Sequence, residues 1–229
     1  MARKRLNANW ASDPGAQARF GCEIELLRAM EHPNIVPLCG VSISTIDRSY
    51  CMPLYPSTLR RQLAEGVHYS VGDVLALARS IASALDYAHA LGFTHRDLKP
   101  DNILIDDEGR PIICDWGLGQ FIHKHSKVLQ LTVGGPMGTE YYCDLEQWNS
   151  GNGGTLGDVY SLGMTLAEVA RGRAIQIRQV GFGITEDVLQ PHTSAAVQLN
   201  QLFRRMTSLS RASRCQSMGE VLVALSWIA

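Results

Sequence analysis

The sequence has no cysteine arrangement that indicates a disulfide framework or a structural zinc site. Its six cysteines are scattered through 229 residues and include no C-x-x-C pair. Disulfide-rich secreted domains are much shorter and space their cysteines regularly, and zinc sites need closely spaced ligand pairs. We therefore expect free, mostly buried thiols in a protein of a reducing compartment.

Long apolar runs and a strong net charge are also missing. No stretch reaches the roughly 18 uncharged apolar residues that a bilayer span requires. The basic start, residues 1–6, lacks the apolar run of a signal peptide. The formal net charge is only -1, which gives no general attraction to nucleic acid or to anionic membranes. These absences predict a cytoplasmic protein with neither partner, although the basic run 3–5 leaves nuclear import open.

The composition is that of an ordinary soluble globular protein, with 45% hydrophobic and 19% charged residues. Periodicity and turn signals predict a helix at 16–31, strands at 35–41 and 49–54, a helix at 73–91 ended by Gly92, a strand at 111–114, a buried helix at 158–170 and two helices within 197–229. Residues 93–105 and 117–154 read as irregular. Because no regular βαβ alternation appears, we expect an α+β protein with a small mixed front part and a mostly helical remainder.

One segment carries dense chemistry. Residues 95–102 read HRDLKPDN, and Asp115 follows thirteen residues after Asn102 within the triplet Asp-Trp-Gly. Transfer of a phosphoryl group needs a carboxylate to take a proton, oxygen ligands for Mg²⁺ and a cation near the moving group. Asp97 would take the proton. Asn102 and Asp115 would supply the oxygen ligands, and Lys99 would be the cation. The alternative is a polar turn between two strands.

The pattern H-R-D-x-K-x-x-N followed by D-x-G resembles the catalytic loop and the metal-binding loop of eukaryotic-type serine/threonine protein kinases. The resemblance implies that Asp97 is the catalytic base and that Lys99 faces the γ-phosphate of ATP. It implies further that Asn102 and Asp115 hold Mg²⁺. Arg96 would then be available to an activation-loop phosphate. His95 and Trp116 would pack behind the site.

Further positions agree with this family along nearly the whole chain. The resemblance makes Lys4 the nucleotide-binding lysine and Glu23 its ion-pair partner on a regulatory helix, with a solvated terminus and a solvated helix face as the alternatives. Met52 matches the gatekeeper position. Leu54 lies in the hinge whose backbone would hold adenine. The family fold then consists of a small, truncated β-rich N-lobe over residues 1–55 and a mostly helical C-lobe over 56–229.

The C-lobe landmarks include one departure. Residues 138–146 have the register of the substrate-docking loop, and Gly138-Thr139 is typical of the serine/threonine branch, but Asp-Leu-Glu replaces the usual Ala-Pro-Glu ending. We expect Glu146 to form a buried ion pair with Arg214. Asp158 is expected to brace the catalytic loop. The usual phosphosite position is Gly135, which leaves Thr132 or Ser126 as substitutes.

The family's glycine-rich hairpin, which covers the ATP phosphates, does not precede Lys4. Either the sequence is a fragment of a longer product or the protein is a reduced kinase-like domain. The predicted function is transfer of the γ-phosphoryl group from Mg-ATP to a protein hydroxyl. A pseudokinase scaffold is the alternative, and a small-molecule kinase is a third reading. The sequence His123-Lys124-His125 offers too few ligands to indicate a metal site.

Overall fold

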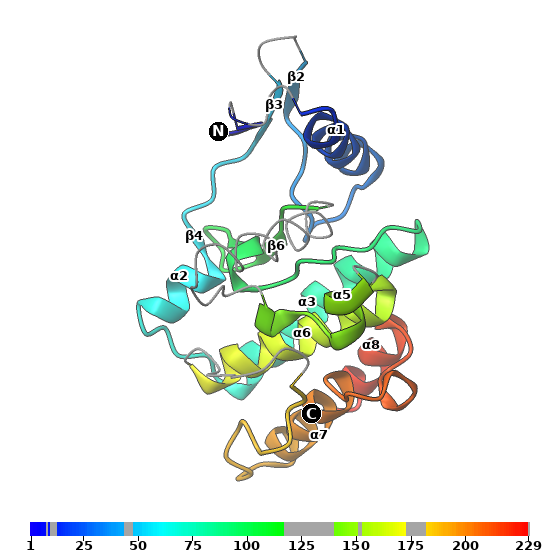
Figure 1. Ribbon diagram of the computed structural model, residues 1–229. Coiled ribbons are helices and arrows are strands. Elements are labelled where there is room, and N and C mark those ends of the chain that lie inside the picture. Colours follow the sequence, from blue (N-terminus) through cyan, green and yellow to red (C-terminus); the bar gives the residue numbers. More distant parts are fainter. Residues whose placement is uncertain are drawn as a thin grey trace.

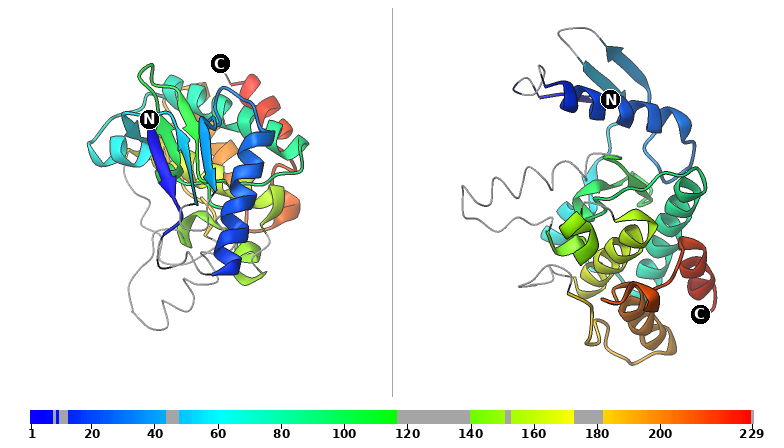
Figure 2. Two further views of the ribbon diagram at one scale, coloured as in Figure 1. Left: turned by 90° about the horizontal axis from the view of Figure 1, so that it is seen from above. Right: turned by 45° about the vertical axis from the view of Figure 1, so that its right-hand side comes forward.

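The computed structural model describes residues 1–7, 9, 13–43, 48–116, 140–150, 153–172 and 182–228 of the chain. A small part built from a sheet and one helix lies above a larger part made mainly of helices (Figure 1). The right-hand view of Figure 2 shows the same arrangement, and the left-hand view looks down onto the small part. This is the α+β organisation that the sequence predicts.

The small part is built on a three-stranded antiparallel sheet. Its strands β1 (Ala2–Arg5), β2 (Gly40–Ile43) and β3 (Arg48–Met52) lie in the order β1-β3-β2. Helix α1 (Pro14–Ala29) packs on this sheet through Phe20, whose ring centroid lies 5.7 Å from that of Tyr50. The side chain of Asp13 caps α1 by accepting the backbone N–H of Ala16 at 2.5 Å.

A second antiparallel sheet joins the two parts. It contains β4 (Ser57–Thr58), β5 (Ile103–Ile105) and β6 (Pro111–Ile113), in that order. The predicted strand at 35–41 is wrong: only Gly40 and Val41 belong to a strand, and Ile35 forms an isolated bridge with Ile113. Pro37 lies within this stretch and has no N–H to donate, so a continuous ladder is interrupted there.

The larger part is a set of packed helices: α2 (Leu59–Ala64), α3 (Val71–Ala90), α5 (Leu145–Ser150), α6 (Gly154–Arg171), α7 (Ser194–Met206) and α8 (Met218–Ser226). Short 3-10 turns occur at η2 (Pro100–Asn102), η3 (Glu140–Tyr142) and η4 (Arg211–Ser213). None of the helices described is long and apolar enough to cross a membrane. Two stretches predicted as irregular contain regular elements. Residues 93–105 include η2 and β5, and residues 117–154 include η3 and α5.

Helices α3 and α6 show why the sequence forms them. Ser70 and Asp73 form a reciprocal capping box at the start of α3. Gly92 has φ +82°, and its N–H donates to the carbonyl of His89 at 2.9 Å, so this glycine ends the helix as predicted. Helix α6 is buried from Gly157 to Val169, which explains its nearly uniform apolar composition. The predicted catalytic loop lies between α3 and β5.

Candidate active site

The carboxylate of Asp97 is held at one oxygen and left without a partner at the other. Lys99 Nζ lies 2.8 Å from Asp97 Oδ2, and Asn102 Nδ2 donates to the same oxygen at 3.1 Å and to the Asp97 carbonyl at 2.8 Å. Asp97 Oδ1 is buried and has no hydrogen-bond partner in the described part of the chain. An oriented carboxylate with one unpaired oxygen is suited to accept a proton from a bound hydroxyl.

The second predicted acid, Asp115, is tied to this loop through the backbone. The N–H of Cys114 donates to the carbonyl of Asn102 at 3.0 Å, which places the residue before Asp115 directly against the catalytic loop. Asp115 itself has φ +64°, a left-handed conformation that non-glycine residues rarely adopt and that clusters at functional sites. The structure therefore brings Asp97, Asn102 and Asp115 together, as the sequence predicts.

Behind these acids, two buried rings support the loop from below. The rings of His95 and Trp116 meet edge to face, with centroids 4.9 Å apart. His95 Nε2 also lies 2.9 Å from the carbonyl of Cys114, so the imidazole connects the two loops. The packing predicted for His95 and Trp116 is present.

Lys4 links the small part to the same site. It lies on β1, and its Nζ is 2.6 Å from Glu23 Oε1 on α1 and also contacts the carboxylate of Asp115. Tyr50 donates to the same Glu23 oxygen at 2.9 Å. Burial disfavours the charge on Lys4, but the two facing carboxylates outweigh it and hold the pKa of Lys4 above its ordinary value. Lys4 is therefore a firmly charged ammonium at the site.

The oxygen atoms at this site suit a hard divalent cation. Asp115 offers a partly exposed carboxylate, and the amide nitrogen of Asn102 is turned toward Asp97, which leaves Asn102 Oδ1 as the atom for a cation. Mg²⁺ prefers carboxylate and carbonyl oxygens and usually binds through one or two of them together with substrate phosphates. The donors present thus fit Mg²⁺ bound with a nucleotide.

Asp158 braces the catalytic loop from α6. Its carboxylate is fully buried and accepts the backbone N–H groups of His95 and Arg96, each at 2.8 Å. His89 Nε2 lies 2.8 Å from the same carboxylate. Arg96 has φ +66°. The brace predicted from the sequence is confirmed, and it holds a strained residue directly before Asp97.

The ion pair predicted between Glu146 and Arg214 is corrected by the structure. Arg214 Nη1 lies 2.5 Å from Asp144 Oδ2, and both side chains are almost fully buried. Glu146 is 53% exposed and lies 2.9 Å from Arg211 Nη1. Arg211 also reaches Asp144, at 2.8 Å. The Asp in the unusual Asp-Leu-Glu ending therefore takes the buried position, and it caps α5 by accepting the N–H of Gln147 at 2.8 Å.

Other residues at the site were not predicted. Arg60 on α2 contacts buried Glu168 on α6 at 2.5 Å and the hydroxyl of Tyr142 at 2.7 Å, so one arginine ties three segments near the catalytic loop. Gln147 donates to the carbonyl of Arg96 at 2.5 Å. Neither contact has a signal in a single sequence: Gln147 follows the predicted docking loop at 138–146, its partner is a backbone carbonyl 51 residues away, and the partners of Arg60 are also distant in the chain.

Two predicted nucleotide contacts lie where the two parts connect. Met52 ends β3, and Leu54 lies in the segment between β3 and β4 with its side chain exposed. Their contacts with adenine remain predictions. Several other predictions lie outside the described residues: Gly117, the phosphosites Ser126 and Thr132, the pair Gly138-Thr139, and the histidines at 123 and 125.

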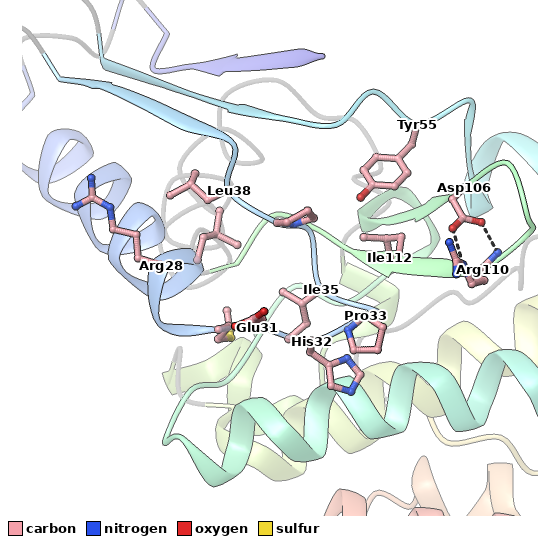
Figure 3. A pocket seen from close by; sticks show the side chains of 13 residues that line it. Arg28, Glu31, His32, Pro33, Ile35, Leu38, Tyr55, Asp106, Arg110 and Ile112 are labelled. Atoms are coloured by element: carbon pink, nitrogen blue, oxygen red, sulfur yellow. Dashed lines mark hydrogen bonds and ion pairs between the residues drawn. The ribbon is translucent and has the colours of Figure 1, made fainter.

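A pocket of about 810 Å³ lies beside this connecting segment, and neither Asp97 nor Asp115 lines it. Figure 3 shows Tyr55 and Ile112 facing Leu38 across it, with the Asp106–Arg110 ion pair at one edge. No predicted site residue lines this pocket. It is a cavity at the junction of the two parts and is separate from the site around Asp97.

Comparisons with known proteins show which family the chain resembles. The family model described as the protein kinase domain matches residues 1–224. The probable serine/threonine-protein kinase PknB of Lactococcus lactis is 29% identical over 174 residues, which is 76% of this chain and 27% of that protein. PknD of Chlamydia trachomatis is 26% identical over 267 residues, covering 98% and 28%. PrkC of Bacillus subtilis is 28% identical over 202 residues, covering 87% and 31%.

These three relatives are all described as serine/threonine-protein kinases. The matched region amounts to only 27% to 31% of their length. The domain match, in contrast, extends over almost the entire chain, from residue 1 to residue 224. The chain therefore belongs to the protein kinase family.

Proposed function

We propose that this chain is an active serine/threonine protein kinase that transfers the γ-phosphoryl group of ATP to a protein hydroxyl. The observation that carries the proposal is the state of Asp97. One of its oxygens is held by Lys99 and Asn102, and the other is buried and unpaired. A scaffold that only keeps the fold has no need for a carboxylate oriented in this way.

In this proposal Asp97 Oδ1 accepts the proton of the substrate hydroxyl as the hydroxyl oxygen bonds to the γ-phosphorus. The bond between that phosphorus and the bridging oxygen breaks, and ADP leaves. Lys99 lies 2.8 Å from Asp97 and offers positive charge to the transferring group. Positioning and electrostatics, rather than a covalent intermediate, supply most of the rate in this reaction class.

The remaining site residues hold the nucleotide. Asn102 and Asp115 would ligate Mg²⁺, which neutralises phosphate charge when bound. Lys4, oriented by Glu23, would contact the phosphates from the small part. Met52 and Leu54 would border adenine at the connection between the parts. We propose a protein substrate, and neither nucleic acid nor membrane as partner, in a cytoplasmic setting.

The test is transfer of labelled γ-phosphate from Mg-ATP to a generic protein substrate. The variant Asp97→Asn keeps the size of the side chain but removes its basicity, and general-base loss typically costs about 10²–10⁴-fold in rate. Asp115→Asn should lose activity in a way that excess Mg²⁺ partly restores. Phosphoamino-acid analysis of the product should show phosphoserine or phosphothreonine. Equal transfer by wild type and Asp97→Asn would remove the enzymatic function and leave a non-catalytic binding module.

A further inference from the structure

A single buried glutamine joins the docking-loop helix to the catalytic loop. Gln147 lies on α5, is only 1% exposed, and its Nε2 donates to the carbonyl of Arg96 at 2.5 Å. Its Oε1 is buried and has no hydrogen-bond partner in the described residues. Burying a polar side chain with one of its two polar atoms unpaired costs free energy of folding, so its presence here calls for a structural explanation.

The residue that Gln147 binds, Arg96, is under backbone strain. Arg96 adopts φ +66°, and its peptide groups are held from two sides. Asp158 on α6 accepts its N–H at 2.8 Å, while Gln147 on α5 donates to its carbonyl. The Arg96 carbonyl belongs to the peptide bond that leads into Asp97. Because that peptide is planar, fixing its oxygen also fixes the direction in which the Asp97 backbone leaves Arg96.

Gln147 is itself held in place by its surroundings. Its backbone N–H is accepted by Asp144, the residue that also binds Arg211 and Arg214. The carboxamide lies against two glycines: a Cβ atom on Gly153 would meet Gln147 Oε1 far inside van der Waals contact, and one on Gly157 would come within 2.8 Å. Gly153 has ordinary backbone angles, φ -74° and ψ -37°, so no unusual backbone conformation requires a glycine here. What the glycine provides is room for the carboxamide of Gln147.

We propose that Gln147 is a positioning residue that sets the orientation of the catalytic base by clamping the Arg96 carbonyl opposite Asp158. This inference rests on the proposed kinase function for its catalytic consequence. Gln147 touches no reacting atom, so its removal affects the placement of Asp97 rather than the binding of nucleotide. The clamp also makes α5, which follows the docking loop in the chain, a structural support of the catalytic loop.

The primary test compares wild type with Gln147→Leu and Gln147→Glu. Leucine has a similar volume but no donor, and glutamate has the same shape but presents only acceptors when ionised. We expect kcat to fall by about 10- to 100-fold in both, because small displacements of a catalytic group have effects of this size. KM for ATP should stay unchanged, since the nucleotide contacts of Lys4 and Asp115 are intact. A merely structural role would change stability without separating kcat from KM.

A second variant reaches the same hydrogen bond without altering the glutamine. In Gly153→Ala the new methyl displaces the carboxamide of Gln147, so kcat should fall as in Gln147→Leu. The two changes should be strongly non-additive, because the methyl has nothing left to displace in the double variant. Gly72→Ala is the matched control: its nearest neighbour, Ser70 Oγ, would be 3.7 Å from the new Cβ, and activity should be retained.

Amide hydrogen exchange provides a readout that needs no activity. The N–H groups of His95 and Arg96, both bound to Asp158, should exchange faster in Gln147→Leu and in Gly153→Ala than in wild type. Unchanged exchange there, or an unchanged kcat in folded variants of an active wild type, would overturn the inference. If the wild-type protein showed no phosphoryl transfer, the proposed function would be contradicted instead. The hydrogen-exchange rates would still decide whether Gln147 holds the Arg96 carbonyl.

Discussion

The ammonium of Lys4 lies 2.6 Å from Glu23 Oε1 and also contacts the carboxylate of Asp115. One cation thereby joins β1, α1 and the predicted metal-binding residue. Glu23 is 0% exposed, so its charge depends on this contact and on the hydroxyl of Tyr50. The position of α1 relative to the catalytic loop is coupled to a single ion-pair network.

Lys4→Met should therefore impair both catalysis and stability. Removing Lys4 leaves the fully buried Glu23 without its cationic partner, and breaking a buried ion pair in this way costs about 3–5 kcal/mol. Nucleotide use should also fall, with KM for ATP raised at least tenfold. The double variant Lys4→Met/Glu23→Gln should regain much of the stability, because no charge stays buried, but none of the activity. Urea unfolding and steady-state kinetics measure the two effects; recovery of both together would contradict the assignment.

The corrected ion pair gives an ordered prediction for the docking-loop helix. Asp144 is 1% exposed and contacts both Arg211 and Arg214, whereas Glu146 is 53% exposed and contacts Arg211. Asp144→Ala should destabilise by about 3–5 kcal/mol because Arg214 loses its buried partner. Glu146→Ala should cost less than about 1 kcal/mol, as is typical of surface ion pairs.

Thermal unfolding of the two variants side by side checks this order. Asp144→Asn is the useful control, since it keeps the acceptor for the Gln147 N–H but loses the charge, and it should lie between wild type and Asp144→Ala. A larger loss in Glu146→Ala than in Asp144→Ala would restore the pairing that the family motif suggested.

The convergence of Asp97, Lys99 and Asn102 could be predicted from the sequence because their motif has fixed spacing over a short range. Asp97, Lys99 and Asn102 lie within six residues and share one loop, so their convergence follows from local geometry. The capped helix α3 was predictable for the same reason, since a glycine marks its end. The partner of Arg214 was not, because Asp144 and Glu146 are two residues apart and only packing decides which side chain faces inward.

The strand predicted at 35–41 failed for a related reason. Its apolar residues suggested a strand, but Ile35 and Val36 are buried against β6 rather than paired within a sheet of their own, with the Val36 N–H donating to the Ile113 carbonyl at 2.9 Å. The apolar character of Ile35 and Val36 therefore reflects their burial and does not indicate a strand. Gln147 escaped prediction because the partner of its carboxamide, the Arg96 carbonyl, lies 51 residues away in the chain and is a backbone atom without sequence signal.

The end of α8 provides a test of tertiary capping. Arg79 on α3 donates from Nη2 to the carbonyls of Leu225 and Ile228, at 2.9 Å and 3.0 Å. Carbonyls at the C-terminus of a helix have no partner within it, and a cationic donor satisfies them. Arg79→Met should lower the free energy of unfolding by about 1–2 kcal/mol. Arg79→Lys keeps the charge but lacks the guanidinium group, so its urea unfolding midpoint should lie between those of wild type and Arg79→Met. Equal midpoints for all three proteins would show that the contact contributes nothing to stability.

His32 predicts how stability depends on pH. Its Nδ1 accepts the Asn34 N–H at 3.1 Å, and its Nε2 lies 3.2 Å from Ser83 Oγ, so the neutral ring is the form that fits. Burial lowers the pKa of His32 below its ordinary value of 6.5. The unfolded chain therefore binds this proton first, and stability is lost as pH falls below about 6.5 toward the folded pKa. Above that window the contribution of His32 to the pH dependence vanishes.

The variant His32→Asn isolates this effect, because asparagine can accept the same backbone N–H two residues on but does not titrate. The difference in unfolding midpoint between pH of about 7.5 and 5.5, which brackets the ordinary histidine pKa, should be smaller in His32→Asn than in wild type. His192→Asn, at an exposed histidine, controls for the loss of one titratable ring and should follow wild type. The comparison cancels the contributions of the other histidines, which all three proteins share. If His32→Asn lost as much stability on acidification as wild type, the proton taken up on unfolding would have to bind to another group, and His32 would not account for the pH dependence.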